Sequence, residues 1–168
     1  MYGLATSFGK TAWADPARSG KVCVLRSSIA EGQTSQIVNH TVNARRNPSC
    51  CTKNERGSWW QVGFTSNLAL VLSHYTLRHG CCDGVCVLKN WEFQGSNDGE
   101  RWTILDAHKD ATSLPLQSFS TCTYRVKGNV TAMRYFRVLQ TGKNSTGNFR
   151  LYISGLELYG LLVQLENV

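Results

Sequence analysis

Short apolar and aromatic stretches separated by turn residues run along most of the chain, and none keeps the 3.6-residue period of a helix. Within Leu88–Gly95, Trp91 and Phe93 alternate with polar residues, as in a strand with one buried face. Asp98 and Gly99 follow soon after, and this pair favours the positive φ angles of a tight hairpin turn. Repeated short strands with regular turns predict an all-β sandwich or barrel.

The predicted strands are rich in aromatic and β-branched residues, which fit a pleated surface. The polar stretch Gln33–Asn54 is predicted to be a long loop with one strand inside it, at Ile37–Val42. We expect one domain, in which residues 1–20 form an irregular N-terminal segment, 21–160 the sandwich and 161–168 a tail. The other predicted strands are Val22–Leu25, Ser58–Phe64, Leu70–Arg78, Leu88–Gly95, Trp102–Leu105, Ser118–Val126, Tyr135–Thr141 and Leu151–Gly160.

The chain of 168 residues carries 18 Lys and Arg against 11 Asp and Glu, a formal charge of +7. Only 17% of its residues are charged, below the usual value of about 25%, so the positive charge reflects a shortage of acids. The one adjacent basic pair is Arg45-Arg46, and no run of four basic residues occurs. We therefore expect no nucleic-acid partner. A hydrophobic share of 42% excludes a disordered chain.

Seven cysteines cannot all be paired within one chain. The N-terminus lacks the basic and apolar regions of a signal peptide, and no run of about 18 apolar residues could span a membrane. These features predict an intracellular, cytoplasmic protein with reduced thiols, and secretion by another route stays open. The glycosylation sequons at Asn39, Asn129 and Asn144 are close to the number that chance supplies, so they decide nothing.

Several longer motifs occur in a characteristic order. They are SWWQVGF at Ser58–Phe64, SHYTLRHG at Ser73–Gly80, LKNWEFQGSNDGERWTIL at Leu88–Leu105, YFRVLQTGKNSTG at Tyr135–Gly147 and LYISGLELYG at Leu151–Gly160. In these motifs the chain resembles the discoidin, or coagulation factor V/VIII type C, superfamily of galactose-binding-like domains. It is most similar to intracellular modules of BTB/POZ adaptor proteins and HECT-type ubiquitin ligases, whose N-terminal segment resembles Thr6–Val22. Gly63 departs from the superfamily pattern, which usually has Asp there.

The resemblance implies a jelly-roll sandwich of about eight antiparallel strands, with a ligand surface formed by loops at one end. Two such loops would be Asn43–Gly57 and His79–Val87. Arginine suits carboxylate, phosphate or sugar hydroxyl ligands because its planar fork makes paired hydrogen bonds. The candidate ligand-binding residues are Arg45, Arg46, Arg56, Arg78, His79 and Asp83.

The function implied by the resemblance is a non-catalytic recognition module that binds a protein partner or substrate for a ubiquitin ligase. A lectin-like module for galactose or fucose is the alternative, and binding to a membrane surface is a weaker one. No motif of a hydrolase, metalloprotease or nucleotide-dependent enzyme occurs, so we expect neither catalysis nor a cofactor. The sequence at Asp98 is explained by its hairpin turn, although a calcium site built from backbone carbonyls stays open.

Five of the seven cysteines fall in the two proposed ligand loops. Cys82 and Cys86 have the spacing of a zinc knuckle, and Cys50 and Cys51 could complete a set of four ligands. Neighbouring side chains diverge, however, which makes vicinal cysteine pairs poor knuckles. Free thiols are the preferred interpretation, with a disulfide and zinc as alternatives. The remaining cysteines, Cys23 and Cys122, lie in predicted strands and are expected to be small buried residues.

Overall fold

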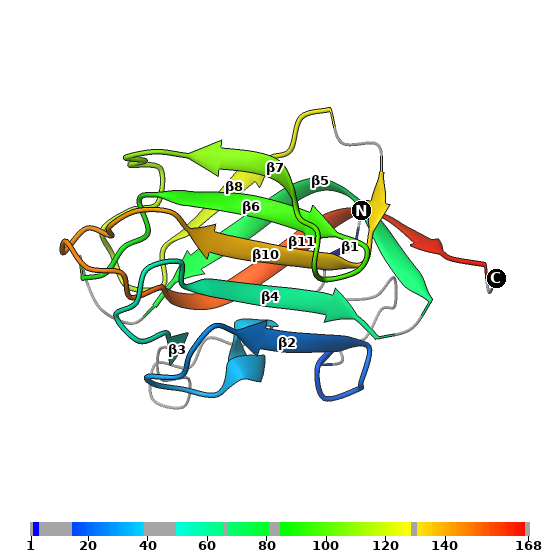
Figure 1. The fold of residues 1–168 in the computed structure, drawn as a ribbon, viewed down its shortest axis with the longest axis horizontal. Coiled ribbons are helices and arrows are strands. Elements are labelled where there is room, and N and C mark those ends of the chain that lie inside the picture. The colour runs from blue at the N-terminus through cyan, green and yellow to red at the C-terminus, as the bar shows by residue number, and fades with distance from the viewer. Residues whose placement is uncertain are drawn as a thin grey trace.

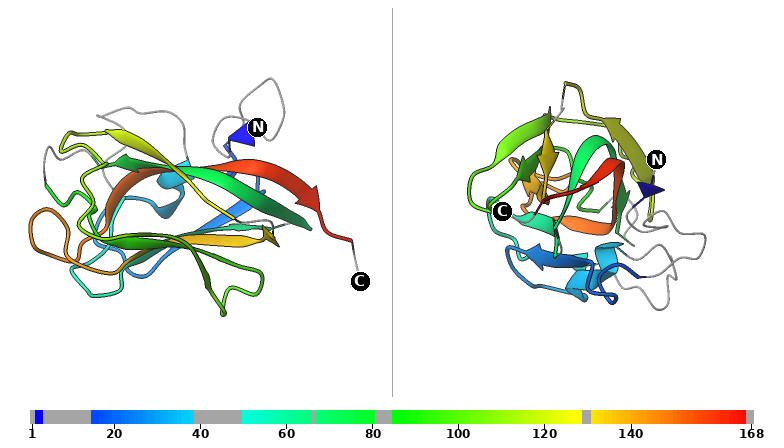
Figure 2. Two further views of the ribbon diagram at one scale, coloured as in Figure 1. Left: turned by 90° about the horizontal axis from the view of Figure 1, so that it is seen from above. Right: turned by 90° about the vertical axis from the view of Figure 1, so that its right-hand side faces the viewer.

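The computed structural model describes residues 2–3, 15–38, 50–65, 67–80, 85–128 and 131–166. Within these ranges, strands form two antiparallel sheets that pack face to face (Figures 1 and 2). The first sheet has the order β1 (Tyr2–Gly3), β11 (Tyr152–Gln164), β5 (Leu68–His79) and β8 (Thr121–Arg125), with β3 (Cys50–Cys51) also on β11 and β9 (Ala132–Met133) also on β5. The second has the order β2 (Val22–Arg26), β4 (Trp59–Phe64), β10 (Tyr135–Gln140), β6 (Trp91–Ser96) and β7 (Thr103–His108).

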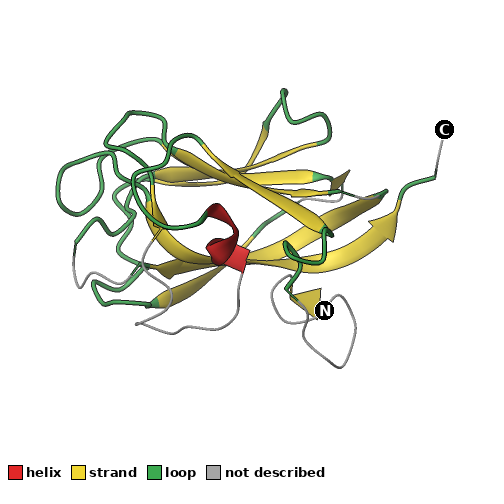
Figure 3. Cartoon of the chain, turned by 90° about the horizontal axis from the view of Figure 1, so that it is seen from below, coloured by secondary structure: helices red, strands yellow, loops and turns green. Residues whose placement is uncertain are grey.

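This arrangement confirms the predicted all-β sandwich. Eight of the described strands have five residues or more, in agreement with a jelly roll of about eight strands. In the described ranges the helical content is one short 3-10 helix, η1 (Thr34–Val38), and no helix has the length and apolar character to cross a membrane (Figure 3).

Aromatic side chains from both sheets fill the core because alternate residues of each strand point inward. Trp60, Tyr75 and Phe93 are fully buried, and the Tyr75 and Phe93 rings stack with centroids 3.9 Å apart. Trp59, next to Trp60 in β4, is half-buried, as expected for adjacent residues of a strand. One tryptophan of this pair thus enters the core and the other does not.

Three details differ from the sequence-based expectations. The predicted strand Ile37–Val42 is wrong in its described part, where Ile37 and Val38 end η1 with fully buried side chains. The strand β11 does not stop at Gly160 but pairs with β5 through Gln164, so part of the expected tail belongs to the sandwich. Cys23 and Cys122 are half-buried rather than buried, because β2 and β8 lie at sheet edges.

A steric constraint explains why glycine occupies position 63 in this chain. Gly63 lies directly opposite Tyr135 in the pairing of β4 with β10. A Cβ atom at Gly63 would lie only 2.5 Å and 2.8 Å from two ring carbons of Tyr135. The glycine therefore makes room for the tyrosine ring, and the departure from the superfamily pattern leaves the strand intact.

Candidate functional site

Several loops meet at the end of the sandwich where β2, β5, β7 and β10 finish, on the left in Figure 1. We call this the loop end. The described parts of both proposed ligand loops, residues 50–57 and 85–87, lie there, and the C-terminus lies at the opposite end. Hydrogen bonds between side chains and backbone hold these loops in place, as described below.

Arg26, the last residue of β2, braces the loop that follows it. Its guanidinium donates hydrogen bonds to the carbonyls of Glu31 (2.6 Å) and Gly32 (2.5 Å). It also donates to the Cys51 carbonyl at 3.3 Å and lies over the Trp60 ring, 4.9 Å from the centroid. Burial lowers the pKa of Arg26 from its ordinary value. The arginine thus connects three segments of the loop end to the sandwich core.

A second loop, residues 144–150, folds around the side chain of Asn144, which is 5% exposed. Its Oδ1 accepts the backbone N–H of Thr146 (3.0 Å) and of Asn148 (3.2 Å). Its Nδ2 donates to Asn148 Oδ1 (2.7 Å) and to the Arg150 carbonyl (3.0 Å). The amide nitrogen of this sequon is therefore buried and bonded, so Asn144 has a structural role in the loop.

Cys51 and Cys86 pack together with Tyr152 in a small buried cluster, which brings the two proposed ligand loops into contact. Burial raises the pKa of Cys50 and of Cys51 to about 11. Both thiols are therefore protonated at neutral pH. Among the described residues, no group of three His, Cys, Asp or Glu side chains could hold a metal ion. Cys82 lies outside the described residues.

The expected ligand-binding residues lie in different environments. Arg78 is half-buried, and its guanidinium donates to the Ser154 hydroxyl (3.1 Å) and carbonyl (2.6 Å). The His79 side chain is 0% exposed, which corrects its expected position at a ligand surface. Arg56 is exposed, with its guanidinium 5.3 Å from the centre of the Phe149 ring. Arg45, Arg46 and Asp83 lie outside the described residues.

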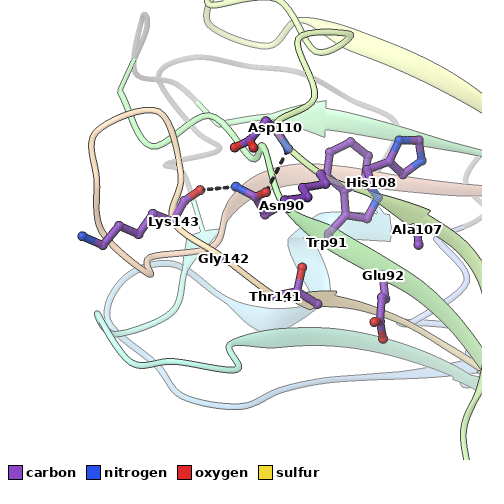
Figure 4. Close-up of a pocket in the computed structure, with 10 residues that line it drawn as sticks. Asn90, Trp91, Glu92, Ala107, His108, Asp110, Thr141, Gly142 and Lys143 are labelled. Carbon is purple, nitrogen blue, oxygen red and sulfur yellow. Dashed lines mark hydrogen bonds between the residues drawn. The ribbon is translucent and has the colours of Figure 1, made fainter.

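An open cavity of about 580 Å³ lies at the loop end, where β6 begins and β7 and β10 finish (Figure 4). We call it the polar basin. The Trp91 ring lies against it, fully buried, and the His108 ring stacks on Trp91 with centroids 4.1 Å apart. Asn90 fixes the rim, because it accepts the Asp110 backbone N–H (2.9 Å) and donates to the Lys143 carbonyl (2.8 Å).

A hydrogen-bond network that runs from the core to the surface positions His108 at the basin. The hydroxyl of Tyr75 accepts from the Trp91 indole at 3.1 Å and donates to Asp106 Oδ2 at 2.9 Å. His108 Nε2 lies 2.7 Å from the same carboxylate oxygen. Burial raises the pKa of Tyr75, so its hydroxyl is protonated and can act as the donor.

Sequence reasoning did not identify the basin. It is lined by residues from three separate segments, 90–92, 107–110 and 141–143, and no local motif connects them. For His79, a usable signal did exist. This residue continues the period-two series of Tyr75 and Leu77, both buried, so the alternation itself indicates an inward side chain.

Solved structures share this fold. Module CBM32-3 of a family 31 glycoside hydrolase from Clostridium perfringens has a TM-score of 0.67 and 14% identity, and the match covers 85% of this chain and 93% of that one. The lectin domain of lectinolysin, complexed with Lewis B antigen, has a TM-score of 0.64 and 17% identity over 83% of this chain and 92% of its own. The chain thus has the same β-sandwich fold as these two domains.

Curated relatives by sequence point to the branch that the motifs indicated. They are E3 ubiquitin-protein ligase Ufd4 of Drosophila melanogaster (32% identical over 158 residues, 90% of this chain), E3 ubiquitin-protein ligase hecd-1 of Caenorhabditis elegans (32% over 171 residues, 98%) and BTB/POZ domain-containing protein At2g30600 of Arabidopsis thaliana (28% over 167 residues, 95%). The chain spans only 6%, 6% and 20% of their respective lengths. No protein-family model matches the chain.

Proposed function

We propose that this chain is a non-catalytic recognition module that binds a protein partner or substrate of a ubiquitin ligase through its loop end. The observation that carries the proposal is its 32% identity to two E3 ubiquitin-protein ligases over at least 90% of its own length. Because the module corresponds to 6% of those proteins, ligase chemistry would be performed by other parts of a longer protein. Such a module would work inside the cell, in the cytoplasm.

The charge of the loop end supports this proposal. In the described ranges, exposed basic residues at the loop end outnumber exposed acidic ones. The hydrogen bonds of Arg26 and Asn144 hold the backbone of these loops in place. A positive, preorganised surface favours an acidic partner and accelerates its association. Of the contact residues expected from the sequence, the exposed Arg56 fits this role best, and Arg45, Arg46 and Asp83 stay predictions. The exposed bases are Lys53, Arg56, Lys109, Lys143 and Arg150, and the exposed acids are Glu31, Glu55 and Asp110.

Carbohydrate binding is the alternative, because the polar basin is open and carries Asn90, Glu92 and His108, which could bond to sugar hydroxyls. Sugar rings usually also stack on an exposed aromatic face. In the basin, the Trp91 ring is 0% exposed and His108 stacks on it. The basin therefore lacks the platform that a sugar site would use, which is why we place protein binding first.

The test compares the wild type with the double variant Lys53→Glu, Arg56→Glu in an affinity pull-down and on a glycan array. Both residues are exposed, so the variant should fold normally. The control is Lys127→Glu, an exposed lysine that follows β8 and lies near Thr103, where β7 begins, away from the loop end. We expect a specific protein partner that binds the double variant at least about fivefold more weakly and binds the control normally. Glycan binding by the wild type on the array, with no specific protein partner in the pull-down, would instead establish the lectin function.

A further inference from the structure

A second cavity, of about 330 Å³, opens on the segment that joins β7 to β8. We call it the apolar slot, because its lining includes Val87, Ala111, Leu114, Pro115 and Leu116. Val87 and Leu114 are 1% and 3% exposed, whereas Leu116 is 65% exposed. The slot thus combines a buried apolar floor with an exposed apolar rim, which a further apolar side chain would cover favourably.

The apolar slot and the polar basin adjoin. Lys89 lines the slot and its neighbour Asn90 lines the basin, while Asp110 lines the basin and its neighbour Ala111 lines the slot. Two hydrogen bonds hold these segments together, from the Ala111 N–H to the Lys89 carbonyl (2.9 Å) and from the Asp110 N–H to Asn90 Oδ1 (2.9 Å). An extended chain could therefore lie across both cavities on a fixed frame.

Lysine side chains surround this combined groove. Lys89 lines the slot, and Lys109 and Lys143 line the basin. Neither of the two ion pairs found in the described part of the chain involves these lysines. The groove has two acids, Glu92 and the exposed Asp110, against these three lysines.

Glu92, the other acid of the groove, interacts with two residues of its own sheet, Gln94 and Arg137. Its Oε2 accepts a hydrogen bond from Gln94 Nε2 at 2.5 Å. Its charge also acts on Arg137, whose pKa burial lowers and Glu92 raises. Because Glu92 has these partners on its own sheet, the groove presents an excess of positive charge to a ligand.

We propose that the apolar slot and the polar basin together bind a short extended segment of a partner protein, with one large apolar side chain in the slot and acidic side chains beside Lys89, Lys109 and Lys143. This inference rests on the proposed function as a protein-recognition module, and it specifies the chemistry of the segment recognised. A volume of about 330 Å³ is at the lower end of the roughly 300–1,000 Å³ usual for ligand cavities, which suits an anchor of one side chain.

The probe for this proposal is a phage-displayed library of random seven-residue peptides, followed by fluorescence anisotropy with the selected peptides. We expect selection of peptides in which a Leu, Ile, Met or Phe is flanked by Asp or Glu. Replacing the apolar residue by Ala, or the acids by Lys, should weaken binding at least about fivefold. Selection of peptides without this composition, or of none, would overturn the proposal.

Variants of the chain locate the binding. Leu116→Asp and Lys143→Glu change exposed residues of the groove, and each should weaken binding at least about fivefold. Lys143→Glu should also improve binding of a peptide whose acids are replaced by Lys. The matched controls are Ile104→Asp, at a side chain 54% exposed on β7, and Lys127→Glu, and both should bind normally. Unchanged binding by Leu116→Asp would refute the slot.

The two proposals fail in distinguishable ways. If the pull-down partner is lost from Lys53→Glu, Arg56→Glu but retained by Leu116→Asp and Lys143→Glu, protein recognition stands and the groove is wrong. If the array shows a glycan and the peptide selection yields nothing, both proposals are wrong. Equal melting temperatures of wild type and variants exclude unfolding as the cause of any loss.

Discussion

Replacing Gly63 by alanine should destabilise this protein, although alanine usually suits a strand better than glycine. The added Cβ would lie 2.5 Å from Cδ1 and 2.8 Å from Cε1 of Tyr135, and 3.1 Å from Cys23 Sγ. The ring has neighbours in other directions as well. The Arg134 guanidinium lies 5.7 Å from its centroid, and the opposite edge of the ring faces Gly99, where an added Cβ would lie 4.0 Å from Cδ2 and from Cε2. The tyrosine therefore cannot move aside without losing contacts.

The size of the effect follows from two opposing contributions to the free energy of unfolding. Alanine in place of glycine within a strand stabilises by roughly 0.5–1 kcal/mol, because the unfolded chain has less freedom to lose. Overpacking against the ring costs roughly 1–3 kcal/mol. Gly63→Ala should thus destabilise by about 1 kcal/mol, and by up to about 2.5 kcal/mol. In a Tyr135→Ala background the ring is absent, so the same substitution should stabilise by about 0.5–1 kcal/mol.

The assay is urea denaturation of the four proteins of this double-mutant cycle, with unchanged slopes as the check on two-state unfolding. The expected coupling between Gly63 and Tyr135 equals the overpacking contribution, about 1–3 kcal/mol. A coupling below about 0.5 kcal/mol would show that the ring and the glycine do not constrain each other, and the steric explanation would then be wrong.

Two further changes probe the core and the loop end. Tyr75→Phe removes a hydroxyl that accepts a hydrogen bond from the fully buried Trp91 indole. The substitution should lower the free energy of unfolding, measured by urea denaturation, by about 1–3 kcal/mol. A cost near zero would contradict the hydrogen-bond network. Because the pKa of Cys50 and of Cys51 is raised from 9.0 to about 11, the unfolded state loses these protons first. The free energy of unfolding should be at its full value below about pH 9 and fall between about pH 9 and 11. A Cys51→Ala variant that loses as much stability over this pH range as the wild type would show that the thiols are not the cause.

Local pattern was enough to predict most of the strands. Alternation around Trp91 and Phe93 depends only on the two-residue period of an extended chain, and β6 is found there. The pair Ile37 and Val38 misled the prediction, because two adjacent apolar residues carry no period. Both are buried in the core cluster, and this burial suits a 3-10 turn as well as a strand.

The candidate site was less predictable. The motifs and their resemblance placed ligand loops at one end, and the contact of Cys51 with Cys86 agrees with that placement of the described parts. The resemblance did not distinguish an exposed side chain such as Arg56 from a buried one such as His79. The two-residue alternation of β5 would have indicated that His79 is buried. For a loop residue such as Arg56 no such period exists, and exposure depends on contacts with residues far away in the chain, such as Phe149.

The sequence by itself determined the all-β class, the turn at Asp98 and Gly99 and the chemistry available to the loops, because periodicity, turn propensity and residue type are local properties. Only the tertiary structure decided that His108 and Lys143 share a basin, and that Lys89 and Leu116 border a slot beside it. The physical reason is that a sandwich joins strand ends in an order set by sheet pairing, with β10 between β4 and β6, and not by distance along the chain.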